Sequence, residues 1–256
     1  MKWLRAGIRL FLASLLTLTA LVVLFVGQLL VLPLPRARAQ WRSVVMLYWA
    51  QAILPVLGVD LTVVGEPPSK PFLLVSNHLS YLDIPVIGSQ VGVVFVAKSE
   101  LASWPVVGFL CRAANTIFVD RNVRRDLQRV MQGIDRELGL GQGVLLFAEG
   151  TSSKGATVLP FRPSLLEPAV RSELPVSYAT LSYHTPEDEQ PAHLAVCWWG
   201  GMDFSPHALN LATLRQVKAK LVFGDKQLHD TDRKRLAEHL RTEVLNRFEP
   251  VVDEEE

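Results

Sequence analysis

The feature that most constrains this chain is a stretch of 23 consecutive uncharged residues, from Leu10 to Leu32. As a helix rising about 1.5 Å per residue, such a stretch is long enough to cross a bilayer core of about 30 Å. Ala37-Arg38-Ala39 resembles a signal-peptidase site, but the apolar run before it is longer than the core of a signal peptide. The sequence therefore predicts a membrane anchor that the mature protein retains.

Charge is distributed unevenly around this stretch. Residues 1–59 contain six basic residues and no acidic residue, a net +6, whereas the remaining 20 basic and 25 acidic residues give −5. The basic segment is suited to anionic lipid headgroups, so membrane lipids are expected partners. Three basic residues lie on each side of the stretch, so the positive-inside rule favours neither orientation. We expect both ends to return to one side of the inner, cytoplasmic membrane, with the domain that follows facing the cytoplasm.

Two prolines, Pro33 and Pro35, end the first expected helix, and apolar residues then recur at amphipathic spacing. This pattern predicts an interfacial second helix from about Arg42 to Leu54, with aromatic residues at the headgroup boundary. Those aromatic residues are Trp41, Tyr48 and Trp49. An ordinary amphipathic helix packed on a soluble domain would show the same pattern. The predicted organisation is a membrane-associated two-helix segment, residues 1–59, followed by a folded domain, residues 60–256.

After residue 58, short apolar runs alternate with helical patterns, which is typical of an α/β fold with a sheet covered on both faces. One helix is indicated by apolar residues spaced three or four apart between Leu127 and Leu138. A last helix is expected to begin at a cap at Asp230 or Thr231 and to end at Pro250. We predict a mixed, mainly parallel sheet flanked by helices. The expected strands are Leu61–Val64, Phe72–Ser76, Val93–Ala97, Asn115–Val119, Val144–Ala148, Val176–Leu181, Leu194–Trp198 and Lys218–Phe223.

The second of these runs leads directly into Asn77 and His78, and Asp83 follows the histidine by five residues. On one continuous helix this separation corresponds to about 140° of rotation, so the two side chains would not share a face. The spacing favours His78 in a turn and Asp83 in the first turn of a helix, with Ser80 as a candidate N-cap. Asp83 would then orient one imidazole nitrogen while the other faces a substrate, as general-base catalysis requires. A capped turn with a non-catalytic histidine would have the same sequence.

Two further polar clusters follow expected strands, at the strand ends where α/β folds place binding groups. Asp120-Arg121 is the first, and Arg121 is either a fork-shaped ligand for an anion or a solvated residue at a strand end. Glu149-Gly150-Thr151-Ser152-Ser153 is the second. Its glycine permits a close turn, and its hydroxyl and N–H groups are suited to an oxyanion, although such loops are often only turns.

Taken together, these clusters resemble the 1-acylglycerol-3-phosphate acyltransferase family in order and spacing. The resemblance covers roughly residues 61–222. It rests on four motifs: Asn77-His78 with Asp83, Lys98-Ser99-Glu100-Leu101 leading to Phe118-Val119-Asp120-Arg121, Phe147-Ala148-Glu149-Gly150-Thr151, and Leu174-Pro175-Val176. It implies transfer of a fatty acyl group from acyl-CoA or acyl-carrier protein to the free hydroxyl of a lysolipid, without a covalent enzyme intermediate. It also implies an N-terminal helix pair that lies in one leaflet.

The same resemblance implies roles for individual residues. His78 would be the general base, and Asp83 would orient it and support the imidazolium that forms. The residues implied to bind substrate are Asn77, Lys98, Arg121, Glu149, Gly150, Thr151, Ser152 and, on a following loop, Arg162. No cofactor beyond the acyl donor is expected.

The third motif departs from the usual Phe-Pro-Glu-Gly-Thr-Arg of the family. Ala148 replaces the proline, and Ser152 replaces the arginine, which removes a guanidinium from the expected phosphate site. Arg121 remains, and Arg162 follows, so we expect lysophosphatidic acid as the acceptor and phosphatidic acid as the product. The alternative acceptor is a lyso-aminolipid such as lyso-ornithine lipid, because Gly-Thr-Ser-Ser resembles the variant found in acyltransferases for that lipid.

Two other classes of function compete with this one. A metal-dependent phosphoesterase could use His78, Asp83 and Glu149 as ligands, but it needs a closer set of such residues than the sequence shows. A membrane scaffold could keep the fold without the chemistry, which the intact His78 and Asp83 argue against. Cys111 and Cys197 lie far apart and have no metal-binding spacing, so we expect two reduced thiols and no metal site. Nothing in the sequence indicates a nucleic-acid partner.

Overall fold

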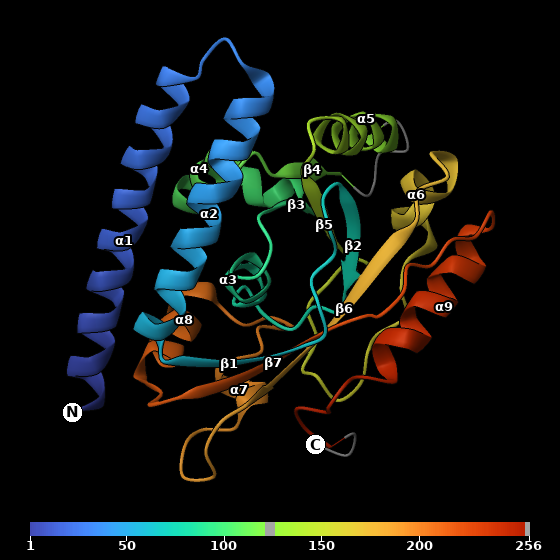
Figure 1. Cartoon of the computed structure of the whole chain (residues 1–256). Coiled ribbons are helices and arrows are strands. Elements are labelled where there is room, and N and C mark those ends of the chain that lie inside the picture. Colours follow the sequence, from blue (N-terminus) through green and yellow to red (C-terminus); the bar gives the residue numbers. More distant parts are fainter. Residues whose placement is uncertain (121–125, 254–256) are drawn as a thin grey trace.

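The computed structural model describes residues 1–120 and 126–253. Two antiparallel helices, α1 (Lys2–Leu30) and α2 (Pro35–Leu57), stand beside an α/β domain (Figure 1). The strands are β1 (Val59–Val64), β2 (Phe72–Ser76), β3 (Val93–Lys98), β4 (Ile117–Val119), β5 (Gly143–Phe147), β6 (Val176–His184) and β7 (Val217–Phe223). The helices of the domain are α3 (Asp83–Gly88), η1 (Ser99–Ser103), α4 (Pro105–Ala113), α5 (Asp126–Gly139), η2 (Pro163–Leu166), α6 (Glu167–Arg171), α7 (Ala192–Ala195), α8 (Phe204–Thr213) and α9 (Arg233–Leu245).

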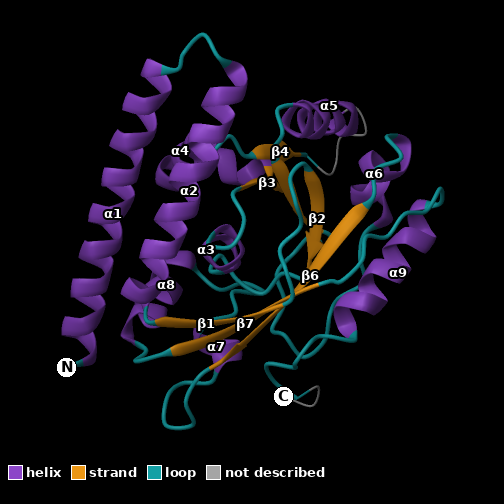
Figure 2. Ribbon diagram, viewed as in Figure 1, coloured by secondary structure: helices purple, strands orange, loops and turns teal. Residues whose placement is uncertain are grey.

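The described strands form one seven-stranded sheet in the order β1-β7-β6-β2-β5-β3-β4. Five strands, from β6 to β4, run parallel, while β7 pairs antiparallel with β6 and parallel with β1. The predicted mixed, mainly parallel sheet is therefore confirmed (Figure 2). Helices cover both faces, so β2 and β5 are buried along their whole length and read as continuous apolar runs.

The pleat of each strand divides its side chains between two cores. Phe72 and Leu74 of β2 pack in the core shared with α3 and α8. Leu73 and Val75 point the other way, into the core shared with α5 and α9. This alternation fixes the direction in which each strand end presents its side chains.

The first two helices pack against each other as an antiparallel hairpin. Pro35 occupies the first turn of α2, where its missing N–H costs nothing, so α2 begins seven residues before the predicted start. The Trp41 indole donates a hydrogen bond to the Leu24 carbonyl at 3.2 Å, and the Trp49 indole donates to Thr17 at 3.1 Å. The two rings therefore pack between α1 and α2, and their position relative to the lipid headgroups stays a prediction. Only Tyr48 of the three aromatic residues is exposed.

Other expectations also need correction. The run Leu194–Trp198 is not a strand, because the short helix α7 occupies its beginning, and its end is an irregular segment in which the Trp198 N–H donates to the Leu79 carbonyl at 2.8 Å. The helix α9 is capped by Asp232, which accepts hydrogen bonds from two N–H groups of the first turn, rather than by Asp230 or Thr231. The division of the chain at residue 59 stays a prediction.

Candidate active site

The sheet brings two of the predicted polar clusters together. Strands β2 and β5 are parallel neighbours, and Ser76 lies opposite Phe147 at their carboxyl ends. The segments that follow, with His78 and Glu149, therefore leave the same edge of the sheet side by side. This is the edge at which α/β proteins bind ligands.

Asp83 is the first residue of α3, as the spacing from His78 predicts, and the structure shows that it is fully buried. Its Oδ2 lies 2.6 Å from Nδ1 of His78 and also accepts the N–H groups of Leu79, at 2.8 Å, and Ser80, at 3.1 Å. Because a carboxylate only accepts, Nδ1 is assigned the proton, and the other nitrogen, Nε2, is left with its lone pair. Ser80 is not the N-cap. Its hydroxyl accepts the Leu82 N–H within the turn.

The segment after β5 holds His78 in place from a second direction. The imidazole stacks on the Phe147 ring, with centroids 4.0 Å apart and planes 13° from parallel. The His78 N–H donates to Glu149 Oε1 at 3.1 Å, and the His78 carbonyl accepts the Ser153 N–H at 3.1 Å. The backbone on both sides of the imidazole is thus fixed by a loop 71 residues away in sequence.

Glu149 is 2% exposed, and its second oxygen, Oε2, has no hydrogen-bond partner within the described part of the chain. Burial raises the pKa of this carboxyl from 4.5 to about 8, and the nearby Asp83 charge adds to the effect, although the His78 N–H opposes it. At neutral pH the carboxyl is therefore mainly protonated. It acts here as a neutral acceptor behind the histidine rather than as a second anion.

The turn after Glu149 offers free backbone donors. Gly150 has φ +74°, a left-handed conformation that costs glycine little and other residues more, and its N–H bonds the Phe147 carbonyl at 3.0 Å. The N–H groups of Thr151 and Ser152 make no hydrogen bond in the described residues, and both residues line the cavity beside His78. Successive backbone N–H groups in such a turn form a concavity suited to an oxyanion.

The other residues predicted to bind substrate are placed differently. Lys98, at the end of β3, is exposed and lines the cavity. Asn77 is fully buried, and its amide bridges the N–H and the carbonyl of Leu181, so it ties β2 to β6 rather than facing a ligand. The Arg162 guanidinium donates to the Glu149 carbonyl at 3.2 Å and is not among the residues that line the cavity. Arg121 lies outside the described residues.

Ser152, which stands where the family usually has arginine, makes a specific contact. Its hydroxyl donates a hydrogen bond to the Trp198 carbonyl. The short polar side chain therefore joins the turn after β5 to the irregular segment after α7, a contact that the sequence did not indicate.

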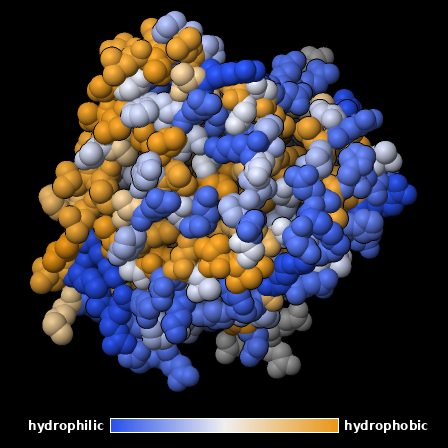
Figure 3. Space-filling model, in the orientation of Figure 1, coloured by the Kyte–Doolittle hydropathy of each residue, from blue (hydrophilic) through white to orange (hydrophobic). Residues whose placement is uncertain are grey.

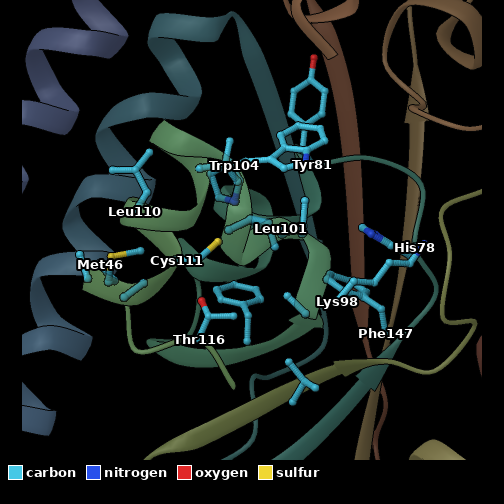
Figure 4. A pocket seen from close by; sticks show the side chains of 18 of the residues that line it. Met46, His78, Tyr81, Lys98, Leu101, Trp104, Leu110, Cys111, Thr116 and Phe147 are labelled. Carbon is cyan, nitrogen blue, oxygen red and sulfur yellow. The ribbon is translucent and has the colours of Figure 1, made fainter. Parts of the chain in front are cut away.

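The cavity has a volume of about 650 Å³ and runs from His78 under the helix hairpin. Figure 4 shows His78 and Phe147 at one end and Met46, Leu110 and Cys111 toward the other. Its walls are almost entirely apolar and come from α1, α2, η1, α4 and the strand ends. Most of this lining could not be predicted from the sequence. The one local signal is the helical spacing of Val107, Leu110 and Cys111, which places these three side chains on one face of a helix. Among the described residues, no group of three or more His, Cys, Asp or Glu side chains could hold a metal ion.

Comparisons with known proteins show the family to which the chain is similar. The family described as "Acyltransferase" matches residues 60–181. The lyso-ornithine lipid O-acyltransferase of Rhodobacter capsulatus is 34% identical in an alignment of 190 positions that covers 68% of this chain and 67% of that protein. The enzyme of Rhizobium meliloti with the same name is 30% identical over 87% of this chain and 79% of its own. The 1-acyl-sn-glycerol-3-phosphate acyltransferase of Neisseria meningitidis is 32% identical over 58% of this chain and 62% of its own.

A crystal structure shares the fold. The 1-acyl-sn-glycerophosphate acyltransferase PlsC of Thermotoga maritima superimposes with a TM-score of 0.67 over 96% of both chains, at 21% sequence identity.

Proposed function

The chain belongs to the acyltransferase family, and from this premise we propose that it transfers a fatty acyl group from a thioester donor to the free hydroxyl of a lysolipid. The observation that carries the proposal is the His78–Asp83 pair, held at 2.6 Å at one end of a long apolar cavity. A general base must lie where the reacting hydroxyl arrives, and an acyl chain needs an apolar site of this size.

In the proposed reaction, Nε2 of His78 takes the proton of the hydroxyl while its oxygen attacks the thioester carbonyl carbon. The imidazolium that forms lies against the Asp83 carboxylate, and it returns the proton to the departing thiolate. The Thr151 and Ser152 N–H groups are proposed donors to the oxyanion of the tetrahedral intermediate. The donor, acyl-CoA or acyl-carrier protein, is a co-substrate, and the reaction needs no resident cofactor.

For the acceptor, we favour a lyso-aminolipid such as lyso-ornithine lipid. Among the described residues that line the cavity, Lys98 is the one cation, while Arg162 contacts a backbone carbonyl outside it. The ornithine headgroup carries a carboxylate and an ammonium group, and Lys98 and Glu100 of the cavity wall complement these two charges. Two of the relatives named above act on this lipid by name.

Lysophosphatidic acid, the acceptor that the sequence motifs favoured, is the second candidate. It is supported by the similarity to the Neisseria enzyme and by Arg121, whose guanidinium suits a phosphate monoester.

One assay tests both the reaction and the acceptor. Purified protein is given a panel containing lyso-ornithine lipid and lysophosphatidic acid, each with acyl-CoA and with acyl-carrier protein as donor. We expect acylation of lyso-ornithine lipid at the higher kcat/KM. A preference for lysophosphatidic acid reverses the order of the two acceptors, and the absence of transfer to any lysolipid refutes the proposed reaction.

We also propose that the protein lies in one leaflet of the cytoplasmic membrane through α1. One stripe of this helix exposes large apolar side chains: Leu4, Ile8, Phe11, Leu15, Leu18, Val22, Val26 and Leu29. In Figure 3 apolar residues gather along the edge of the molecule formed by α1. These residues recur three or four apart, so the lipid-facing surface runs along the helix.

The other side of α1 is tied to the catalytic domain. Arg5 donates to the Thr213 carbonyl at 3.2 Å, and Arg9 donates to the Arg215 carbonyl at 3.0 Å. Thr213 is the last residue of α8, where backbone acceptors are unpaired and a cation is favourable, and Arg215 lies two residues beyond it. These contacts hold the N-terminal part of α1 beside the domain, which supports a helix that stays there.

A further inference from the structure

We infer that Tyr183 is a positioning residue for the reaction, and that it acts through the second oxygen of Asp83; this inference rests on the proposed function. Tyr183 lies in β6, 100 residues after Asp83 in the chain, and belongs to none of the four motifs. Its hydroxyl donates a hydrogen bond to Asp83 Oδ1 at 2.8 Å.

The two oxygens of Asp83 have different partners. Oδ2 takes the imidazole of His78 and two backbone N–H groups, while the Tyr183 hydroxyl is the partner of Oδ1. Both Asp83 and Tyr183 are fully buried, so water does not replace a missing donor at Oδ1 without a change in packing. The carboxylate plane, and with it the direction of the imidazole, is thus defined from both ends.

The surroundings keep the tyrosine in the role of donor. Burial and the Asp83 charge raise the pKa of Tyr183 well above its ordinary value, so the phenol stays protonated. The other titratable groups facing Asp83 are His78, Glu149 and Cys197, and burial raises the pKa of the Cys197 thiol as well. Neither the protonated thiol nor the neutral Glu149 carboxyl hydrogen-bonds to Oδ1 in the described structure.

This arrangement has a consequence for proton affinity. A donor to Oδ1 spreads the negative charge of the carboxylate, which lowers the affinity of the His78–Asp83 pair for a further proton. Without the donor the charge concentrates on Oδ2, the imidazolium is held more tightly, and the pair binds its proton at higher pH. Catalysis needs the neutral imidazole, so the acid limb of the pH profile should move to higher pH.

The test is Tyr183→Phe, which removes one hydroxyl and leaves the ring. We expect kcat to fall by about tenfold, as for the loss of a hydrogen bond to a charged group, with KM for both substrates within about twofold. The apparent pKa of the acid limb in the pH profile of kcat/KM should rise by roughly half a unit. Tyr178→Phe is the matched control. It removes a buried hydroxyl from the same strand, but one bonded to Asp225 and Glu243 on the other side of the sheet, so the limb should stay in place.

Two further measurements test whether the Tyr183 hydroxyl sets the proton affinity of the His78–Asp83 pair. Incorporation of 3,5-difluorotyrosine at position 183 supplies a more acidic, stronger donor and should move the acid limb to lower pH. NMR titration of the His78 imidazole, identified by its absence from His78→Ala, should give a higher pKa in Tyr183→Phe than in the wild type. This readout does not require activity, so a wild type without acyl transfer refutes the proposed function while the imidazole pKa still decides the inference. If Tyr183→Phe leaves both the acid limb of the pH profile and the pKa of the imidazole unchanged, the inference about Tyr183 is overturned, even if the variant is less stable.

Discussion

The buried carboxyl of Glu149 should make the stability of the protein depend on pH in a way that one substitution removes. Its pKa is raised from 4.5 to about 8 by burial. Between pH 4.5 and about pH 8 the Glu149 carboxyl is ionised in the unfolded state and protonated in the folded state, so the folded state binds more protons. The contribution of this group is therefore most favourable below pH 4.5, and it is lost as the pH rises toward 8.

The size of this effect follows from the raised pKa. Relative to a neutral side chain, ionisation of the unfolded state destabilises the fold by about 1 kcal/mol at pH 5, about 3 kcal/mol at pH 7 and about 4 kcal/mol at pH 8. Glu149→Gln keeps an oxygen for the His78 N–H and removes the titration. The amide of the variant introduces a constant offset, so the expected result is a change in slope. Between pH 5 and pH 8 the variant should gain about 3 kcal/mol on the wild type, or roughly 6–12 °C in Tm.

Thermal unfolding of both proteins in the same detergent, at intervals from pH 5 to pH 8, measures this difference. Other titrating groups, including His207 with its lowered pKa, cancel because they are common to both proteins. Glu243→Gln is the control. The pKa of Glu243 is lowered to about 2 by its partners Arg247 and Lys226, so it titrates below the tested range and its removal should leave the slope unchanged. A constant difference between Glu149→Gln and the wild type across the range would refute the neutral buried carboxyl.

Three other predictions concern the chemistry, the membrane and the acceptor. His78→Ala should lower kcat by roughly 10²–10⁴-fold or more in a folded protein, and Asp83→Asn should also lose most activity because an amide cannot support the imidazolium; near-normal turnover of His78→Ala would exclude the assigned base. Single cysteines placed near Lys2 and near Arg42, in a Cys111→Ser background, should react with an impermeant thiol reagent from the same side of the membrane, and labelling from opposite sides would mean a true span. Arg121→Ala should raise the KM for lysophosphatidic acid sharply, by the equivalent of about 1.5–3 kcal/mol, whereas an unchanged KM would show that this arginine does not hold the phosphate.

Local patterns in the sequence were enough to predict the class of fold and the central pair of the site. Apolar runs such as Phe72–Ser76 predict buried strands, because a strand covered on both faces has no polar side. The five-residue spacing of His78 and Asp83 predicted a turn followed by a helix, because both residues belong to one short segment whose geometry is settled by its neighbours.

Tertiary structure alone decided which of the remaining side chains meet, because these contacts join segments that are far apart in the chain. The Trp41 ring packs on Gly27 of α1, where a Cβ would come within 2.1 Å of it, and no local pattern in the sequence indicated this contact. Leu194–Trp198 resembled a strand, since a short apolar run does not distinguish a strand from a buried turn. Tyr183 reaches Asp83 only through the pairing of β2 with β6, and no local pattern encodes that neighbour. Local conformational preferences act over a few residues, whereas burial and hydrogen bonding in the core depend on which strands lie side by side.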